Sequence, residues 1–278
     1  MTSIEHIAGQ VMTIGLEGVS LDSSNREMLD AVRPGGVIYF QRNIETSEEF
    51  AKLVFETRIQ LRETFPFLAI DLEGGTVDRL RQLIAPLPAV QPIARRGLGR
   101  ELGILAGREL SAYGLNVDFA PVLDLSLGPS ENVLTTRTAG QSPEEVIRFA
   151  LQFLAGLSDT GIVGCGKHFP GLGGGNLDSH LDMPCIGRTY EELWSEDLLP
   201  YRELADSLPM VMVAHAWYPH LERELGWDGG ERPASISPEI ISLLLRSRLN
   251  YSGLVLCDDL EMGGVLAVRC IEIGRAHV

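Results

Sequence analysis

Residues 161–184 read GIVGCGKHFPGLGGGNLDSHLDMP, and they decide how the rest of the chain is interpreted. A short apolar run ends at Lys167 and His168, and a glycine-rich loop follows. That loop then carries Asp178 and His180. Glycine costs backbone entropy and is used where a chain turns sharply or approaches a ligand. We therefore expect a strand followed by a functional loop, the alternative being a surface loop with solvated polar residues.

Other short apolar runs along the chain resemble the run at 162–168. They occupy residues 10–15, 35–40, 67–71, 116–124, 210–215 and 253–259. Amphipathic segments of helical period lie between them, at 47–63, 99–113, 143–157 and 238–249. Strands buried on both faces that alternate with helices predict a parallel α/β sheet. Without a linker or composition break, this pattern favours a (β/α)8 TIM-type barrel over an open doubly wound sheet.

Polar side chains stand at the carboxyl ends of several of these runs. They are Asp71, Asp124, Lys167, His168, His215, Asp258 and Asp259. In a barrel the strand ends converge on one rim, where the active site lies.

The barrel is predicted to be truncated before its last strand and helix. A strand with its helix needs about 30 residues, and fewer than that follow Asp259. We expect Val265–Glu272 to start a helix and residues 273–278, IGRAHV, to be a non-native tail. The expected organisation is one barrel domain over residues 1–272.

Composition excludes several classes of partner. The chain has 278 residues, 45% of them hydrophobic, and a net charge of -15. No Lys/Arg-rich block suggests nucleic-acid binding. We expect no signal peptide and no membrane span, because no apolar stretch approaches about 20 residues. Four cysteines without CxxC pairing predict a reduced, cytoplasmic protein, and the absence of phosphate-binding motifs predicts no cofactor.

A carboxylate at a barrel rim can attack an acetal carbon as a nucleophile. Asp258 and Asp259 follow the last apolar run, and only one of two adjacent residues can face the barrel mouth. The other would face away or cap the helix that begins near Leu260. The alternative is an acid-rich helix N-terminus without a catalytic role.

Asp178 and His180 form a second candidate pair, carried by the loop. A carboxylate bonded to one imidazole nitrogen fixes the tautomer and makes the other nitrogen more basic. Such a histidine could protonate a leaving oxygen and later deprotonate water. The alternative is an Asx turn beside a solvated histidine.

Four further residues suit a polyhydroxylated ligand. Lys167 and His168 are expected to project donors into the cavity, and Asp71 is an acceptor for a pair of sugar hydroxyls. Arg137, in TTRTAG, is a further donor, unless it is simply a surface arginine.

These residues resemble the single-domain β-N-acetylhexosaminidases of glycoside hydrolase family 3. The resemblance rests on GGVIYFQRN (35–43), IDLEGGTVDRL (70–80), VDFAPVLD (117–124), KHFPGLGGGNLDSHLDMP (167–184), VMVAHAWYP (211–219), PASISP (233–238) and LVLCDDLEM (254–262).

The resemblance implies a retaining exo-glycosidase that releases terminal β-linked N-acetylglucosamine from small glycans or muropeptides. It assigns Asp258 as nucleophile, His180 as acid/base and Asp178 as the residue that holds His180. Sugar binding falls to Asp71, Arg137, Lys167 and His168, and no metal or cofactor is implied.

The chain departs from the family pattern at three places. Residues 170–174 read PGLGG where the family usually has PGHGD, so a histidine and an aspartate are lost. Leu72 replaces a usual glutamine, and Cys257 a usual serine.

Two other hypotheses remain open at this stage. One is a metal-dependent barrel hydrolase that uses His168, His180, His215 and Asp258 as ligands. The other is a non-catalytic sugar-binding protein or an inactive, truncated remnant.

Overall fold

The computed structural model describes residues 4–128, 134, 136–175 and 183–266. It divides the chain into two compact units. Unit 1 comprises residues 1–89, 98–120 and 152–164, and unit 2 comprises residues 90–97, 121–151 and 165–278.

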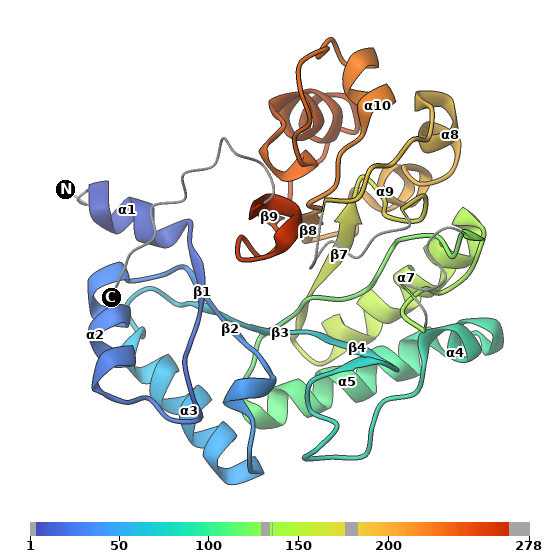
Figure 1. Cartoon of the computed structure of the whole chain (residues 1–278). Coiled ribbons are helices and arrows are strands. Elements are labelled where there is room, and N and C mark those ends of the chain that lie inside the picture. Colours follow the sequence, from blue (N-terminus) through green and yellow to red (C-terminus); the bar gives the residue numbers. More distant parts are fainter. Residues whose placement is uncertain (1–3, 129–133, 135, 176–182, 267–278) are drawn as a thin grey trace. The chain divides into compact units, whose positions relative to one another are not determined.

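Unit 1 is built on parallel strands that hydrogen-bond in the order β1, β2, β3, β6. These strands are β1 (Thr13–Gly15), β2 (Gly36–Tyr39), β3 (Phe67–Ile70) and β6 (Val117–Asp118). The first residues of β7, Val163 and Gly164, pair with β6. Figure 1 shows β1, β2 and β3 side by side. Helix α1 (Ile4–Gln10) precedes β1, and α2 (Ser23–Val32), α3 (Ser47–Gln60) and α5 (Gly99–Tyr113) lie between successive strands, with the 3-10 turn η1 (Gln41–Asn43).

Unit 2 contains the rest of β7 (Val163–Phe169), followed by β8 (Met210–Val213) and β9 (Leu254–Cys257). The three strands are parallel, and β8 lies between β7 and β9 (Figure 1). The helical elements of this unit are α4 (Val90–Arg96), α8 (Tyr190–Ser195), α9 (Leu199–Leu204), α10 (Pro219–Glu224), η3 (Ala234–Ile236), the π-helix η4 (Glu239–Arg248) and α11 (Gly263–Leu266). Helix α7 (Pro143–Asp159) has residues in both units.

Local sequence signals account for the helix ends. Thr46 caps α3 because its side chain accepts from the Glu49 N–H, and the acidic first turn complements the helix dipole. Helix α5 ends at Gly114, whose φ of 83° is a left-handed conformation that glycine adopts without steric cost. Strand β6, which follows α5, is buried, and so is β3 after its first residue, as expected for a parallel sheet covered by helices.

The predicted parallel α/β fold is confirmed, and a strand forms within each of the apolar runs. The run at 116–124 was predicted too long, because only Val117–Asp118 forms a strand. Pro121 has no N–H to donate to a ladder, and beyond it a single bridge joins Val122 to Lys167.

The sequence pattern also missed a short antiparallel hairpin, β4 (Leu72–Gly74) with β5 (Val77–Asp78). Closure into an eight-stranded barrel and the single domain over residues 1–272 stay predictions. Of the helix expected at Val265–Glu272, the structure describes only the residues up to 266, where α11 ends. No helix in the described part of the chain is long and apolar enough to cross a membrane.

Candidate active site

The end of β7 places two polar residues in the interior of unit 2. Lys167 and His168 are only 2% and 5% exposed. The Lys167 N–H donates to the Pro121 carbonyl at 3.2 Å, and the Lys167 carbonyl accepts from the Leu123 N–H at 2.6 Å. Backbone hydrogen bonds to the segment after β6 therefore fix both residues at the strand end.

Asp124 is the buried acceptor for this region. Its Oδ2 lies 2.6 Å from His168 Nδ1, and its Oδ1 accepts the Leu172 N–H at 2.7 Å. One carboxylate thus orients the His168 ring and holds the start of the glycine-rich loop. The sequence analysis placed Asp124 at a strand end but assigned it no role. Its position at the end of an apolar run was the only sequence signal used for it.

The contacts of His168 also determine its tautomer. Arg137 Nη2 lies 3.4 Å from His168 Nε2, and a guanidinium can only donate. Nε2 is therefore the acceptor, and Nδ1 carries the proton that is donated to Asp124. This differs from the expectation that His168 offers a donor to a ligand, because its one ring proton is used by Asp124.

The loop after β7 packs against Arg188 and Asp197. A Cβ added to Gly171 (φ +132°) would lie 2.7 Å from Asp197 Cβ, and one added to Gly174 would lie 2.8 Å from Arg188 Cδ. Arg188 therefore occupies space that an aspartate at position 174 would need, and Leu172 is itself buried. The packing of this loop therefore accommodates Leu172 and Gly174, the two residues that differ from the PGHGD pattern.

Asp197 is a buried ionisable group beside this loop. Its Oδ2 lies 3.1 Å from Arg188 Nε. Burial nevertheless raises the pKa of the Asp197 carboxyl to about 7, because desolvation outweighs the attraction of Arg188, and nearby Asp124 adds to the rise. The Tyr218 hydroxyl donates to the Gly171 carbonyl at 2.8 Å, which holds the same turn from another side.

Asp258 lies directly after β9, at the same edge of the sheet as the end of β7. The Asp258 N–H continues the ladder to the Val213 carbonyl at 3.1 Å, and its half-buried side chain accepts the Asp259 N–H at 2.9 Å. Asp259 is exposed and accepts the Glu261 N–H at 2.9 Å. Asp259 therefore forms an Asx turn, and the helix that follows, α11, begins at Gly263 and not near Leu260 as expected.

The two strand ends are separated by one strand. Neighbouring strands lie about 4.8 Å apart, so β7 and β9 are about 10 Å apart across β8. The structure brings Arg137 and His168 into contact, together with Asp124.

Asp71 belongs to unit 1, between β3 and β4. Its Oδ2 lies 3.8 Å from Arg79 Nη2. Arg79 was not assigned a role from the sequence, although it follows Asp71 within IDLEGGTVDRL. The predicted catalytic pair Asp178 and His180 lies outside the described residues.

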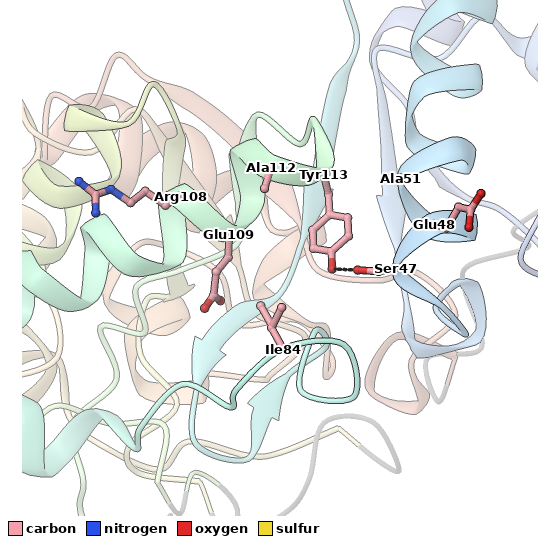
Figure 2. A pocket seen from close by; sticks show the side chains of 8 residues that line it. All are labelled: Ser47, Glu48, Ala51, Ile84, Arg108, Glu109, Ala112 and Tyr113. Atoms are coloured by element: carbon pink, nitrogen blue, oxygen red, sulfur yellow. Dashed lines mark hydrogen bonds between the residues drawn. The ribbon is translucent and has the colours of Figure 1, made fainter.

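The cavity in Figure 2 is a separate feature, on unit 1. It has a volume of about 600 Å³ and is lined by residues of α3, α5 and the segment after β5. The hydroxyls of Ser47 and Tyr113 are hydrogen-bonded there, and burial raises the pKa of Glu109 to about 7, with Asp78 adding to the rise. None of the predicted site residues that the structure describes lines this cavity.

Comparison with known proteins gives a consistent family match. A model of the glycosyl hydrolase family 3 N-terminal domain matches residues 4–275. The β-hexosaminidase of Alkalilimnicola ehrlichii is 38% identical over 261 residues, which cover 90% of this chain and 72% of that protein. The β-hexosaminidase of Pseudomonas aeruginosa is 35% identical over 261 residues, covering 92% of this chain and 75% of that protein.

Solved structures agree with these sequence matches. A glycoside hydrolase family 3 β-N-acetylglucosaminidase from Paenibacillus sp. FPU-7 superimposes with a TM-score of 0.89 at 32% identity. It covers 96% of this chain, which spans about half, 51%, of that structure. NagZ from Neisseria gonorrhoeae gives a TM-score of 0.81 at 31% identity, covering 92% of this chain and 75% of that one. The resemblance drawn from the sequence motifs is confirmed, and the chain belongs to glycosyl hydrolase family 3.

Proposed function

We propose that this protein is a retaining exo-glycosidase that releases terminal, non-reducing β-linked N-acetylglucosamine from small glycans or muropeptides. The observation that carries the proposal is the placement of Asp258 at the same sheet edge as the buried Lys167–His168 pair, in a family 3 chain. The sugar specificity rests on the names of the relatives, a β-N-acetylglucosaminidase among them.

The proposed reaction has two steps at the anomeric carbon. Asp258 attacks this carbon and forms a covalent glycosyl ester, while His180 donates a proton to the departing oxygen. His180, held by Asp178, then removes a proton from water, and the water oxygen displaces Asp258. Two inversions return the sugar with its original configuration.

Sugar binding is assigned to charged groups around the strand ends. Lys167 and Arg137 would donate to hydroxyls, and His168 would be held in place by Asp124 while its Nε2 accepts. Asp71, with Arg79 beside it, would bind a hydroxyl pair. We place these residues at the mouth of a (β/α)8-type barrel, the architecture expected from the alternating strands and helices.

The hydrogen bonds of two histidines argue against the metal-dependent alternative. The lone pair of His168 Nε2 accepts from Arg137, and His215 bonds Ser235 and Asp259 through its two ring nitrogens. Metal ligation requires a free nitrogen lone pair, so each would first have to break one of these bonds.

The test is hydrolysis of chromogenic β-N-acetylglucosaminide by the 278-residue chain, followed by proton NMR of the first sugar released. The proposal predicts turnover with β-configured product, and little turnover of the matching β-glucoside. Initial release of the α-anomer would contradict retention. Calorimetric binding of N-acetylglucosamine without turnover would instead identify a sugar-binding protein.

A further inference from the structure

His215 follows β8, the strand between the two ends of the proposed site. It is fully buried and lies in VMVAHAWYP, a motif that the proposed reaction leaves without a function. Its Nδ1 lies 2.7 Å from the Ser235 hydroxyl and its Nε2 lies 3.0 Å from the Asp259 carbonyl oxygen. His215 thus joins PASISP to the segment that follows β9.

The contact with the Asp259 carbonyl determines where one proton of the His215 ring lies. A carbonyl oxygen can only accept, so Nε2 must carry a proton. The Ser235 hydroxyl can donate to Nδ1, which leaves the ring neutral with Nε2 as its only donor. A neutral ring suits a site with no exposure to solvent, because a buried charge without a partner is costly.

The bond to the Asp259 carbonyl fixes the turn that carries Asp258. That carbonyl also accepts the Met262 N–H at 3.0 Å, and the Asp259 N–H donates to Asp258 Oδ1 at 2.9 Å. Both backbone polar groups of Asp259 are therefore hydrogen-bonded, the carbonyl to His215 and the N–H to the Asp258 side chain. Rotation of this residue would move the hydrogen bond that orients the Asp258 carboxylate.

Packing alone supports this region weakly. Leu254 of β9 is 40% exposed, and Val255 and Leu256 are only half-buried. Ser235 is held more firmly, since its N–H donates to the Ala214 carbonyl at 3.2 Å and the Ala234 N–H donates to the Ala216 carbonyl at 2.8 Å. The backbone on both sides of His215 therefore fixes the position of the Ser235 hydroxyl.

We propose that His215, whose Nε2 is protonated because the Asp259 carbonyl can only accept, is a positioning residue that orients Asp258 through that carbonyl. This inference rests on the proposed function, in which Asp258 is the nucleophile. His215 itself touches neither the sugar nor the reacting atoms in this role. Its loss should lower the rate of the chemical step and leave ground-state sugar binding nearly unchanged.

Two substitutions at position 215 separate positioning from filling of space. The amide nitrogen of His215→Gln reaches about as far as Nε2, whereas that of His215→Asn reaches only as far as Nδ1. We expect His215→Asn to lower kcat roughly 10–100-fold, the cost of a small misplacement of a reacting group, and His215→Gln to recover part of this loss. Ser235→Ala, which removes one neutral hydrogen bond, should lower kcat about 3–10-fold.

KM for a chromogenic β-N-acetylglucosaminide should change less than twofold in each variant, because the contacts with the bound sugar in the ground state stay intact. Matched controls are His220→Gln and Ser207→Ala, at exposed positions of the same unit. Equal kcat in His215→Asn, Ser235→Ala and wild type would overturn the inference if Asp258→Asn has abolished turnover. If Asp258→Asn turns over like wild type, the proposed function fails instead.

Nitrogen-15 NMR of the histidine rings gives a readout independent of activity and of the folding of the His215 variants. In the wild-type chain the ring whose Nδ1 resonance shifts in Ser235→Ala identifies His215, and this ring should be neutral with Nε2 protonated. Protonation of that ring at Nδ1, or the absence of any ring that responds to Ser235→Ala, would overturn the proposed hydrogen-bond order. The NMR experiment tests the hydrogen-bond order even if the wild-type chain shows no turnover.

Discussion

The ends of β7 and β9 belong to the same sheet edge but are held in different ways. At β7, Lys167, His168 and Asp124 are buried, and a 2.6 Å contact joins His168 to Asp124. At β9, Cys257 is exposed and Asp258 is half-buried, and hydrogen bonds at Asp259 maintain the turn.

This difference separates the energetic consequences of mutation at the two places. A buried polar group that loses its partner costs the free energy of its desolvation, so changes near β7 should reduce stability. Changes near β9 remove little buried surface and should reduce the rate while leaving the fold intact. In the proposed reaction the β7 end supplies a prearranged binding surface, and the β9 end supplies the reacting group.

The largest expected effect is on rate, at β9. Asp258→Asn should lower kcat by about 10⁴-fold or more, because removal of a nucleophile leaves only binding and general stabilisation. Its thermal unfolding midpoint should stay close to that of wild type, since the side chain is half-buried. Asp206→Asn, at an exposed position, is the control and should alter neither quantity. A large loss of stability in Asp258→Asn would contradict the contrast between the two strand ends.

The matching substitution on the β7 side is Asp124→Ala. It leaves the His168 Nδ1–H and the Leu172 N–H without their acceptor inside the protein, and should reduce the free energy of unfolding by about 3–5 kcal/mol. Urea denaturation monitored by circular dichroism measures this loss. Asp124→Asn, which retains one carbonyl acceptor, should lose less, and the exposed control Asp228→Ala should lose almost nothing. Equal stability of Asp124→Ala and wild type would contradict the claim that Asp124 stabilises the β7 end.

Asp197 gives the β7 side a pH dependence of stability. Its pKa is raised by burial to about 7, whereas in the unfolded chain it titrates near its ordinary value of 3.8. The stabilising effect of this raised pKa is fully present below about pH 4 and is lost as pH rises toward 7, a change of about 2–4 kcal/mol. Asp197→Asn should lack this component, which unfolding measurements at pH 4.5 and 7.5 can compare. Identical pH profiles of the two proteins would show that Asp197 does not titrate in this range.

The smallest effect concerns the turn after β7. Gly171→Ala places a Cβ within 2.7 Å of Asp197 Cβ at a φ of +132°, so it should destabilise the protein by about 1–3 kcal/mol. Gly187→Ala is the matched control, because nothing lies within 4 Å of its added Cβ and its φ lies outside the positive region that disfavours alanine. Differential scanning calorimetry compares the two. A control that loses as much as Gly171→Ala would contradict the close-packing argument.

Much of this layout could be predicted from periodicity and strand ends. The apolar runs located β7, β8 and β9, and the polar residues that end them include Lys167, His168 and Asp258. A buried parallel strand leaves a clear signal because both faces are apolar. The length of β6 was overestimated, since a proline inside an apolar run ends the ladder without ending the hydrophobicity.

The partners of individual polar side chains could not be predicted in the same way. The contacts of Asp124 with His168 and of Arg188 with Asp197 depend on which way each side chain points after folding. Likewise, Arg188 fills the space beside Gly174, and only the packed loop reveals this. Asp71 remained an isolated acidic residue in the sequence until its ion pair with Arg79 was visible.

Trapping of the glycosyl–enzyme tests the central claim most directly. A 5-fluoro N-acetylglucosaminyl fluoride should load the enzyme faster than water releases the sugar, and fragmentation mass spectrometry then locates the bound sugar. The account predicts the sugar on Asp258, with no labelling of Asp258→Asn. A label on Asp259 or on another residue, or turnover of substrate by a chain that never becomes labelled, would contradict it.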